Sequence, residues 1–461
     1  MLVNDDIHAL SAAVSGIVAV PDSPEFAEET FAFNAATVHR PDVVLGAADA
    51  QDIAAGVKWA AERRLPVSVQ STGHGAESAV DGGLLITTRR LQEVRIDPLE
   101  RTARVGAGVK WRTVLEASVP HGLIGLHGSS TDVGVVGYTV GGGLPVLGRA
   151  HGFAADHVRS MEVVTADGAL RRIDAATEAE LFALMCGGKG NFGIVTALEF
   201  NLFPLENFYG GGIIYPGADA AAVLTAFRTW LPTLPDEASP SISLLRLPDM
   251  EFVPLPLRGQ FVVHMPFAFL GNREDGDALL APMRAVSSPL MDTAGPMNYL
   301  DIDQVHMDPA DPLPFTDAGA LLKEFGEEAA GELLRLAGDG TDCPLLMIEI
   351  RPLGGALSRG GVLPDAVSGR DAAFLLFLLG LKLPPVLPAV TASIHAILAA
   401  MAPYSTGYTL VNFHGVPGDE ADRARAWSPA VYERMRAAKS SYDPGNLLRF
   451  GHAITGVPAA G

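Results

Sequence analysis

The stretch RPDVVLGAADAQDIAAGVKWAAERRLPVSVQS, residues 40–71, indicates how the first half of the chain folds. Its segments VVL and PVSV are typical of buried strands. Between them, Asp49 stands at a helix N-cap position and Asp52 follows three residues later, ahead of apolar residues that share one helical face. The sequence therefore predicts a strand, a helix and a second strand, which lead directly to His74.

The segments that follow leave this alternation of strand and helix. Residues 82–109 contain short β-rich runs that Gly and Pro interrupt, and MEVVTADGALRRI, residues 161–173, is typical of a hairpin with an Asp-Gly turn. A helix is predicted from Thr177, whose hydroxyl would form a capping box with Glu180. The segment GIVTALEFNLF, residues 193–203, then indicates a buried strand. This order predicts an α+β fold.

The second half of the chain has a different sequence pattern. Long strands are predicted in GQFVVHMPFAF, residues 259–269, and in PLLMIEIRPL, residues 344–353, between helices rich in Ala and Leu. We expect a domain boundary near residue 207. Ser428 before Pro429 predicts the start of a last amphipathic helix, which a Pro-Gly turn follows.

Composition excludes several classes of function. The 461 residues carry a formal charge of −20, so a nucleic acid or an anionic membrane surface would be repelled over most of the protein. Cys186 and Cys343 have no CxxC or Cys/His spacing, which supports neither a metal site nor a disulfide framework, and we expect two buried thiols. The first residues, MLVNDDIHAL, lack the pattern of a secretory signal, so a cytoplasmic location is expected.

One segment is strongly apolar. Residues 372–398, AAFLLFLLGLKLPPVLPAVTASIHAIL, are interrupted by Lys382 and by three prolines. A membrane-spanning helix needs an unbroken apolar run of about 20 residues. We therefore expect no membrane span, and we interpret this segment as buried core or as the wall of a pocket.

Three glycine-rich loops lie in the first half, in chain order STGHGAES, GSSTDVGVVGYTVGGGLPVLGRAHG and CGGKGNFGIVT. Glycine allows a backbone to take positive φ and to approach a ligand, and successive N–H groups can bind a diphosphate. None of the loops matches GxGxxG between a strand and a helix, or GxxxxGK[ST]. Each loop alone could be an ordinary tight turn, but three together predict a large nucleotide.

The order and spacing of these segments resemble the PCMH-type FAD-binding domain of the vanillyl-alcohol-oxidase superfamily, and more closely its berberine-bridge-enzyme-like branch. The resemblance covers residues 38–206 and the final YDPGNLLRFGHAI, and it is weaker between residues 210 and 400. It implies an α+β protein with a two-subdomain FAD-binding domain, and a substrate domain whose antiparallel sheet is covered by helices. The expected boundaries are 1–206 for the FAD-binding domain, 207–425 for the substrate domain and 426–461 for a segment that returns to the FAD-binding domain.

The resemblance also implies a role for His74. In this family the matching histidine bonds through a ring nitrogen to the 8α-methyl group of the flavin. Some members add a second bond from a cysteine at the position of Ser130, where a serine hydroxyl cannot replace the thiolate. We therefore expect FAD with a single covalent link, through His74.

Further FAD contacts are implied by the resemblance, residue by residue. They fall on the glycine loops and on the tail: Gly73, His74, Gly75, Ser78, Ser130, Asp132, Val133, Gly137, Tyr138, Gly142, Gly143, Gly193, Val195 and Asn446. The chain departs from the family at Gln70, where arginine is frequent, and at Ser71 and Thr72, where glycines are frequent.

A catalytic base is harder to assign. Many relatives use a tyrosine two residues before the asparagine of a Y-x-N strand, and this chain has Leu410 before Asn412. The nearest titratable replacements are Tyr408, which has the same parity if the strand is regular, and His414.

Glu349, in the apolar strand LLMIEIRPL, is the better candidate. Burial would raise its pKa towards the range of a general base, or its carboxylate would hold a substrate amine or hydroxyl. The alternative is a structural ion pair with Arg351 on the same face of the strand. His127 and His151 flank the flavin loop, and we interpret both as structural.

The expected function is an FAD-dependent oxidase of a small, apolar or aromatic molecule, such as a secondary metabolite. Hydride would pass to flavin N5, and O2 would be the electron acceptor and give H2O2. The alternatives are an oxidative cyclase, a flavin-dependent oxygenase, or a flavoprotein that sequesters a drug-like molecule. We expect no nucleic-acid or membrane partner, and a monomer or homodimer.

Overall fold

The computed structural model describes residues 3–251, 253–361 and 364–457. Its first part contains a four-stranded sheet in the order β1-β2-β4-β3, in which β2 and β3 both pair parallel to β4. The elements are α1 (Asn4–Ala13), β1 (Ile17–Ala19), α2 (Phe26–Thr30), β2 (Val43–Gly46), α3 (Ala50–Glu62), β3 (Val67–Gln70) and β4 (Leu84–Thr87). The predicted strand, helix and strand are β2, α3 and β3. Asp49 caps α3 through the backbone N–H groups of Gln51 and Asp52.

A second, five-stranded antiparallel sheet has the order β5-β6-β10-β8-β9. Its strands are β5 (Val94–Asp97), β6 (Thr102–Gly106), β8 (Val158–Thr165), β9 (Leu170–Asp174) and β10 (Gly193–Asn201). The accompanying elements are α4 (Trp111–Ser118), β7 (Leu123–Ile124), α5 (Val135–Thr139), α6 (Gly148–His151), α7 (Ala179–Met185) and β11 (Phe203–Pro204). The hairpin of β8 and β9 confirms the prediction for residues 161–173.

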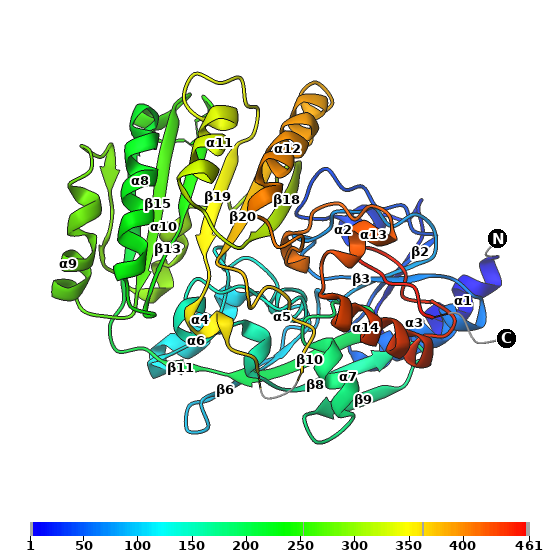
Figure 1. Ribbon diagram of the computed structural model, residues 1–461. Helices are drawn as coiled ribbons and strands as arrows, with labels where there is room; N and C mark the ends of the chain where they lie inside the picture. Colours follow the sequence, from blue (N-terminus) through cyan, green and yellow to red (C-terminus); the bar gives the residue numbers. More distant parts are fainter. Residues whose placement is uncertain (1–2, 252, 362–363, 458–461) are drawn as a thin grey trace.

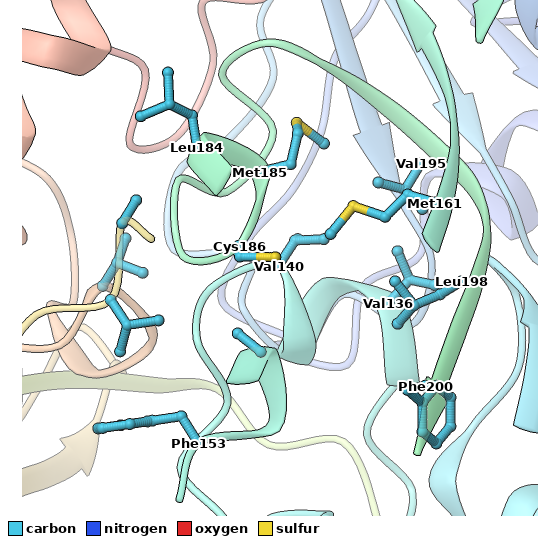
Figure 2. Close-up of a cluster of buried hydrophobic side chains, with 14 of the residues drawn as sticks. Val136, Val140, Phe153, Met161, Leu184, Met185, Cys186, Val195, Leu198 and Phe200 are labelled. Carbon is cyan, nitrogen blue, oxygen red and sulfur yellow. The ribbon is translucent and has the colours of Figure 1, made fainter. Parts of the chain in front are cut away.

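The core of this part lies between the five-stranded sheet and α5 and α7. Figure 2 shows Met161 of β8 and Val195 of β10 on one side, with Val140 and Cys186 opposite them. Cys186 is buried, and so is Cys343 of the second part. This packing places the loops before and after α5 and after α7 around one region of the molecule.

The second part is a nine-stranded antiparallel sheet in the order β16-β12-β15-β14-β19-β20-β18, with β13 and β17 at its side. Its strands are β12 (Tyr209–Pro216), β13 (Ala238–Pro240), β14 (Ile242–Arg246), β15 (Phe261–Phe269), β16 (Met291–Asp292), β17 (Gly295–Pro296), β18 (Phe315–Leu322), β19 (Met347–Pro352) and β20 (Phe374–Leu381). Its helices are α8 (Ala220–Trp230), α9 (Arg273–Arg284), α10 (Asp303–His306), α11 (Glu327–Ala337) and α12 (Leu387–Met401). Helices α8, α11 and α12 line one face of this sheet (Figure 1).

Strand alternation divides the side chains of the large sheet between two faces. In β19, Ile348 and Ile350 pack in the core beneath the helices, so Glu349 and Arg351 project from the opposite face. That opposite face is turned towards the first part of the molecule (Figure 1).

The C-terminal residues return to the first part of the protein. After α13 (Glu420–Ala424), Ser428 caps α14 (Pro429–Tyr442) through the backbone N–H of Val431. Beyond α14, the backbone N–H of Val67 in β3 donates to the carbonyl oxygen of Leu447 at 2.9 Å. The tail therefore extends the edge of the four-stranded sheet at β3.

Two local predictions are wrong. Helix α7 begins at Ala179, and Thr177 does not cap it, because the Asp174 carboxylate takes the backbone N–H of Thr177 at 2.7 Å. Residues 407–415 do not form a regular strand either. Residues 411–413 form a short 3₁₀ turn, in which the N–H of Phe413 donates to the carbonyl of Leu410 at 2.8 Å.

The apolar segment 372–398 divides between a buried strand and a surface helix. β20 is largely buried, whereas α12 packs on β18, β20 and α11 along one side only, through Val390, Ile394 and Ile397. Residues 387–404 are long and apolar enough to cross a membrane by length and composition, and 22% of them are buried. The interpretation as buried core therefore holds for β20 and is wrong for most of α12.

Candidate functional site

The His74 loop begins where β3 ends. The Gln70 amide donates to the carbonyl of Phe31 at 2.9 Å, and its oxygen lies 2.8 Å from His39 Nε2. Gly73 has φ +78°, and a Cβ there would lie 2.7 Å from the Cα of Ala32. Gly73 therefore cannot be replaced without moving the backbone, because it combines a left-handed conformation with close packing.

His74 itself is held by stacking. Its ring lies parallel to that of Phe33, with 3.7 Å between ring centroids, and its Nδ1 is 2.9 Å from Thr72 Oγ1. Burial, together with the positive charge of Lys110, lowers the pKa of His74 to about 4, and the charge of Asp132 opposes both effects. The imidazole is therefore neutral at physiological pH. Its Nε2 is buried and has no hydrogen-bond partner within the described parts of the chain.

A cavity of about 400 Å³ opens beside His74. Its wall combines aromatic and polar side chains of the first part with a short stretch of the second: Phe31, Phe33, Ser71, Thr72, His74, Arg89, Gln92, Gly108, Lys110, Thr113, Asp132, Ala310 and Pro312. This volume is in the range of ligand sites.

The second glycine loop surrounds Tyr138. Gly142 and Gly143 have φ +97° and +68°, and a Cβ at Gly143 would lie 2.6 Å from the Tyr138 ring. The Asn412 amide donates to the Tyr138 carbonyl at 2.9 Å, which connects this loop to the second part. The Tyr138 hydroxyl and Asn412 Oδ1 are buried, and neither finds a partner among residues 3–251, 253–361 and 364–457.

The third glycine loop connects to the tail. Asn191 donates to the carbonyls of Gly188 and His452, and its Oδ1 accepts from the N–H of Ile454 at 2.9 Å. Lys189 has φ +57°, and its Nζ would lie 3.9 Å from a Cβ at Gly75. The first and third glycine loops are therefore neighbours.

The remaining residues that the sequence analysis assigned to FAD are spread over the same region. Ser130 Oγ accepts from the N–H of Asp132 at 3.3 Å, and the Asp132 carboxylate lies 3.2 Å from Lys110 Nζ. Ser78 and Val133 are half-buried, and Gly75 and Gly137 are exposed. Gly193 and Val195 belong to β10, and the Val195 side chain is buried in the core. Asn446 has φ +47° in the tail.

These residues suit a dinucleotide cofactor such as FAD. Each of the three glycine loops contains a glycine with positive φ. Several polar atoms inside the first part or at its junction with the second are buried without a partner in the described chain: Ser71 Oγ, His74 Nε2, Tyr138 OH, Thr139 Oγ1, Asn412 Oδ1, Asn446 Oδ1 and His452 Nε2. Buried polar atoms in native proteins are almost always hydrogen-bonded, so these atoms require partners of the kind that a bound FAD or ordered water supplies.

Opposite these loops, the large sheet presents a polar row. Glu349 is 1% exposed, and its Oε1 accepts from Ser241 Oγ at 2.7 Å while its Oε2 accepts from Arg351 Nε at 2.8 Å. The guanidinium of Arg351 lies over the ring of Phe413 at 5.5 Å. The ion pair with Arg351, the structural alternative to a catalytic role for Glu349, is therefore present, and it lies on the sheet face that is turned towards the first part.

Two further titratable residues, His306 and Asp308, are neighbours of Glu349 and were not expected from the sequence. His306 Nε2 lies 3.9 Å from Glu349 Oε1, and burial, followed by the charge of Arg351, lowers the pKa of His306 well below its ordinary value. Burial raises the pKa of Asp308, which a hydrogen bond from Ser129 and the charge of Arg351 oppose. Both lie at or just after α10, about 40 residues from Glu349 in the chain, so no local pattern connects them to it.

Neither Tyr408 nor His414 is hydrogen-bonded to Glu349 or Arg351 in the described parts of the chain. The carbonyl of Tyr408 accepts from the N–H of Leu321, and His414 Nε2 lies 2.8 Å from the carbonyl oxygen of Asp422. His127 is buried beside Tyr299, with 3.1 Å between Nε2 and the hydroxyl, and the ring of His151 is tilted by 33° against that of Phe203. Of the three proposed catalytic residues, only Glu349 belongs to the polar row.

Comparison with known proteins places these features in context. The family described as FAD binding domain matches residues 41–174. (R)-6-hydroxynicotine oxidase of Paenarthrobacter nicotinovorans is 25% identical over 97% of this chain and 98% of its own length.

Solved structures share the whole fold. Xylooligosaccharide oxidase of Myceliophthora thermophila superposes with a TM-score of 0.85 at 19% identity, over 98% of this chain and 99% of that chain. The berberine-bridge-enzyme-like protein 1 of Physcomitrella patens superposes with a TM-score of 0.84 at 17% identity, over 96% and 97%. The expected α+β fold is therefore confirmed.

Proposed function

We propose that this chain, an FAD-linked oxidoreductase with the PCMH-type fold of the vanillyl-alcohol-oxidase superfamily, is an oxidase of a small organic molecule. When bound, FAD would supply a hydride acceptor at N5 and a route for the electrons to O2, which gives H2O2. One observation carries the proposal: unpartnered polar atoms of the glycine loops lie across from the buried polar row around Glu349.

His74 is the residue we propose for the single covalent link. Its ring is neutral, fixed by Phe33 and Thr72, and its buried Nε2 is available for bonding. Ser130 already accepts from Asp132, and its hydroxyl cannot act as a second covalent ligand. The chain therefore supplies one nucleophile at this position.

Glu349 is the residue we propose to orient the substrate or to take its proton. Arg351 and Ser241 fix both carboxylate oxygens, so the carboxylate is positioned before substrate binds. His306, kept neutral by burial, can donate or accept a hydrogen bond beside it. Neither Tyr408 nor His414 offers comparable geometry.

The surroundings of the row support an apolar or aromatic substrate that carries one hydroxyl or amine. Cross-strand pairing places Phe377 opposite Glu349 and Leu379 opposite Met347. Residues of equal parity on neighbouring strands share a face, so these side chains flank the carboxylate on the face that the helices leave uncovered. A polar centre between apolar neighbours fits such a molecule.

A metabolite screen tests the function. The purified protein is mixed anaerobically with candidate alcohols and amines, and loss of flavin absorbance identifies a substrate. Steady H2O2 formation in air then supports the oxidase. Binding without loss of absorbance would instead support a sequestering protein, and oxygen from labelled O2 in the product would support an oxygenase.

The domain boundaries 1–206, 207–425 and 426–461 remain proposals, as do the cytoplasmic location and a monomeric or homodimeric state. The contact of the tail with β3 supports the discontinuous first domain.

A further inference from the structure

Three titratable side chains from distant segments meet behind the His74 loop, and the proposed function uses none of them. Glu77 lies in the loop after β3, Asp317 lies in β18 of the large sheet, and Lys189 lies in the third glycine loop. Glu77 is 7% exposed. Glu77 Oε2 and Asp317 Oδ1 are buried, and neither is hydrogen-bonded to a donor in the described chain.

The backbone around these residues is fixed by Asn34, which is fully buried. The N–H of Asn34 donates to the carbonyl of Gly73 at 3.3 Å, and its side chain donates to the carbonyl of Phe315 at 3.1 Å and accepts from the Phe315 N–H at 3.3 Å. One residue thus bridges the His74 loop and the start of β18. We call this contact between the loop 73–77 and residues 315–317 the seam.

The two carboxyl groups at the seam are close enough to form a hydrogen bond when one of them carries a proton. Burial raises the pKa of Glu77 to about 7, although Lys382, Asp317 and Lys189 each lower it. Burial and the negative charge of Glu77 raise the pKa of Asp317 well above its ordinary value. Two adjacent carboxyl groups titrate as a pair, because both cannot ionise at once without strong repulsion.

A lysine supplies the opposite charge. Burial lowers the pKa of Lys189 to about 8, and the negative charges of Glu77 and Asp317 oppose this effect. With one proton on the carboxyl pair and one positive charge on Lys189, these three groups are neutral together. The other groups that face them are Lys382 after β20, Asn34 of the seam, and His452 of the tail, which faces Lys189.

We propose that Glu77 and Asp317 share one proton across the seam, and that this pair, with Lys189 as its counter-charge, positions the His74 loop against the substrate-binding half. The three are positioning residues, because they act through the loop. The shared proton allows one carboxyl group to donate to the other. When that proton is lost, two negative charges repel each other across the seam and push the loop away from β18.

The direction of the pH dependence follows from the raised pKa of Glu77. The stabilisation from its proton is complete below the ordinary value of 4.5 and is lost as the pH rises through about 7. The lowered pKa of Lys189 acts in a separate window: between about 8 and 10.5 it makes folding more favourable as the pH rises.

Thermal unfolding of the full-length protein tests the pair. Glu77→Gln keeps a donor to Asp317 but cannot titrate, so its melting temperature relative to wild type should rise by about 2 °C or more between pH 5 and 8. Glu62→Gln is the matched control, because the Glu62 side chain is 74% exposed, and its difference from wild type should stay constant. A Glu77→Gln curve parallel to wild type would overturn the proposal.

Flavin attachment provides the second measurement. Glu77→Ala removes the contact and should lower the fraction of protein with acid-stable flavin, whereas Glu77→Gln should restore it. Asp317→Asn should resemble Glu77→Gln in its pH dependence, and the double variant should add little to either single change. Full flavin attachment in Glu77→Ala, or simple additivity, would contradict a shared proton. The flavin measurement rests on the proposed covalent link, whereas the unfolding measurement requires neither substrate nor attached flavin, so failure of the carboxyl pair and failure of the proposed function can be told apart.

Discussion

The two sides of the site are built in different ways. On the flavin side, glycines with positive φ and backbone groups shape the loops around His74 and Tyr138. On the substrate side, the side chains of Glu349 and Arg351 stand on a regular sheet. Loops shaped by glycines and backbone groups suit a cofactor that proteins of one fold share. Side chains on a regular sheet can be replaced without altering the backbone, so they suit the part of the site that selects a substrate. We therefore expect changes on the flavin side to remove the cofactor, and changes on the substrate side to change the rate.

The largest effect should come from removing the tail, which completes the flavin side. A chain that ends near residue 425 loses Trp427, whose indole N–H donates to the carbonyl of Gly187, and also the buried pair of Lys439 and Asp443. We expect no retained flavin, although His74 and all three glycine loops remain. Flavin absorbance per protein after gel filtration measures this.

A single substitution in the tail tests its contribution to stability without removing it. Lys439→Met leaves Asp443 buried without its cation, which costs about 3–5 kcal/mol of unfolding free energy. Denaturant unfolding measures the loss. Full flavin occupancy in the truncated chain would show that the tail does not belong to the flavin side.

The next largest effect concerns His74. Wild-type protein precipitated with acid should remain yellow, because the proposed bond between His74 and the flavin would survive denaturation. His74→Ala should release the colour into the supernatant, and Ser130→Ala, the matched change at the position of the absent second link, should retain it. A colourless wild-type pellet contradicts the covalent link.

On the substrate side, Glu349→Gln should lower kcat and kcat/KM together by about 10²-fold, because the interaction is required in the transition state. Stopped-flow measurement of flavin reduction isolates this step. Glu199→Gln, a change of a half-buried carboxylate in β10, provides the control. An unchanged rate of flavin reduction in Glu349→Gln would assign Glu349 to a structural pair with Arg351.

The smallest effect should come from Tyr138→Phe, which removes one buried hydroxyl of the flavin side. In a His74→Ala background the flavin can be removed and added again. Without flavin, loss of an unpartnered hydroxyl should raise the unfolding free energy by about 1 kcal/mol, and with flavin the variant should bind the cofactor more weakly. Calorimetric unfolding, with and without flavin, measures whether the substitution raises or lowers the unfolding free energy in each case. Equal shifts in both states would show that the hydroxyl does not contact flavin.

Local sequence patterns correctly predicted those structural features that depend on residues only a few positions apart. Asp49 caps α3 because its carboxylate reaches N–H groups two and three residues ahead, and the hairpin of β8 and β9 follows from its Asp-Gly turn. Glu349 and Arg351 project from the same face of β19, because side chains along a strand alternate between its two faces. The cap expected from Thr177 failed because Asp174, outside the predicted motif, captured its N–H.

What only the tertiary structure decided involves residues far apart in the chain. Nothing in the sequence places His306 beside Glu349, or Asp317 opposite Glu77, because strand order and packing bring these groups together across 43 and 240 positions respectively. The same packing sets the burial that shifts the pKa values of Glu77, Lys189 and His306. The sequence by itself determined the glycine loops and the position of His74, since backbone conformation is a local property. Burial and charge at the site depend on every element that surrounds it, so they were decided only when the two halves packed together.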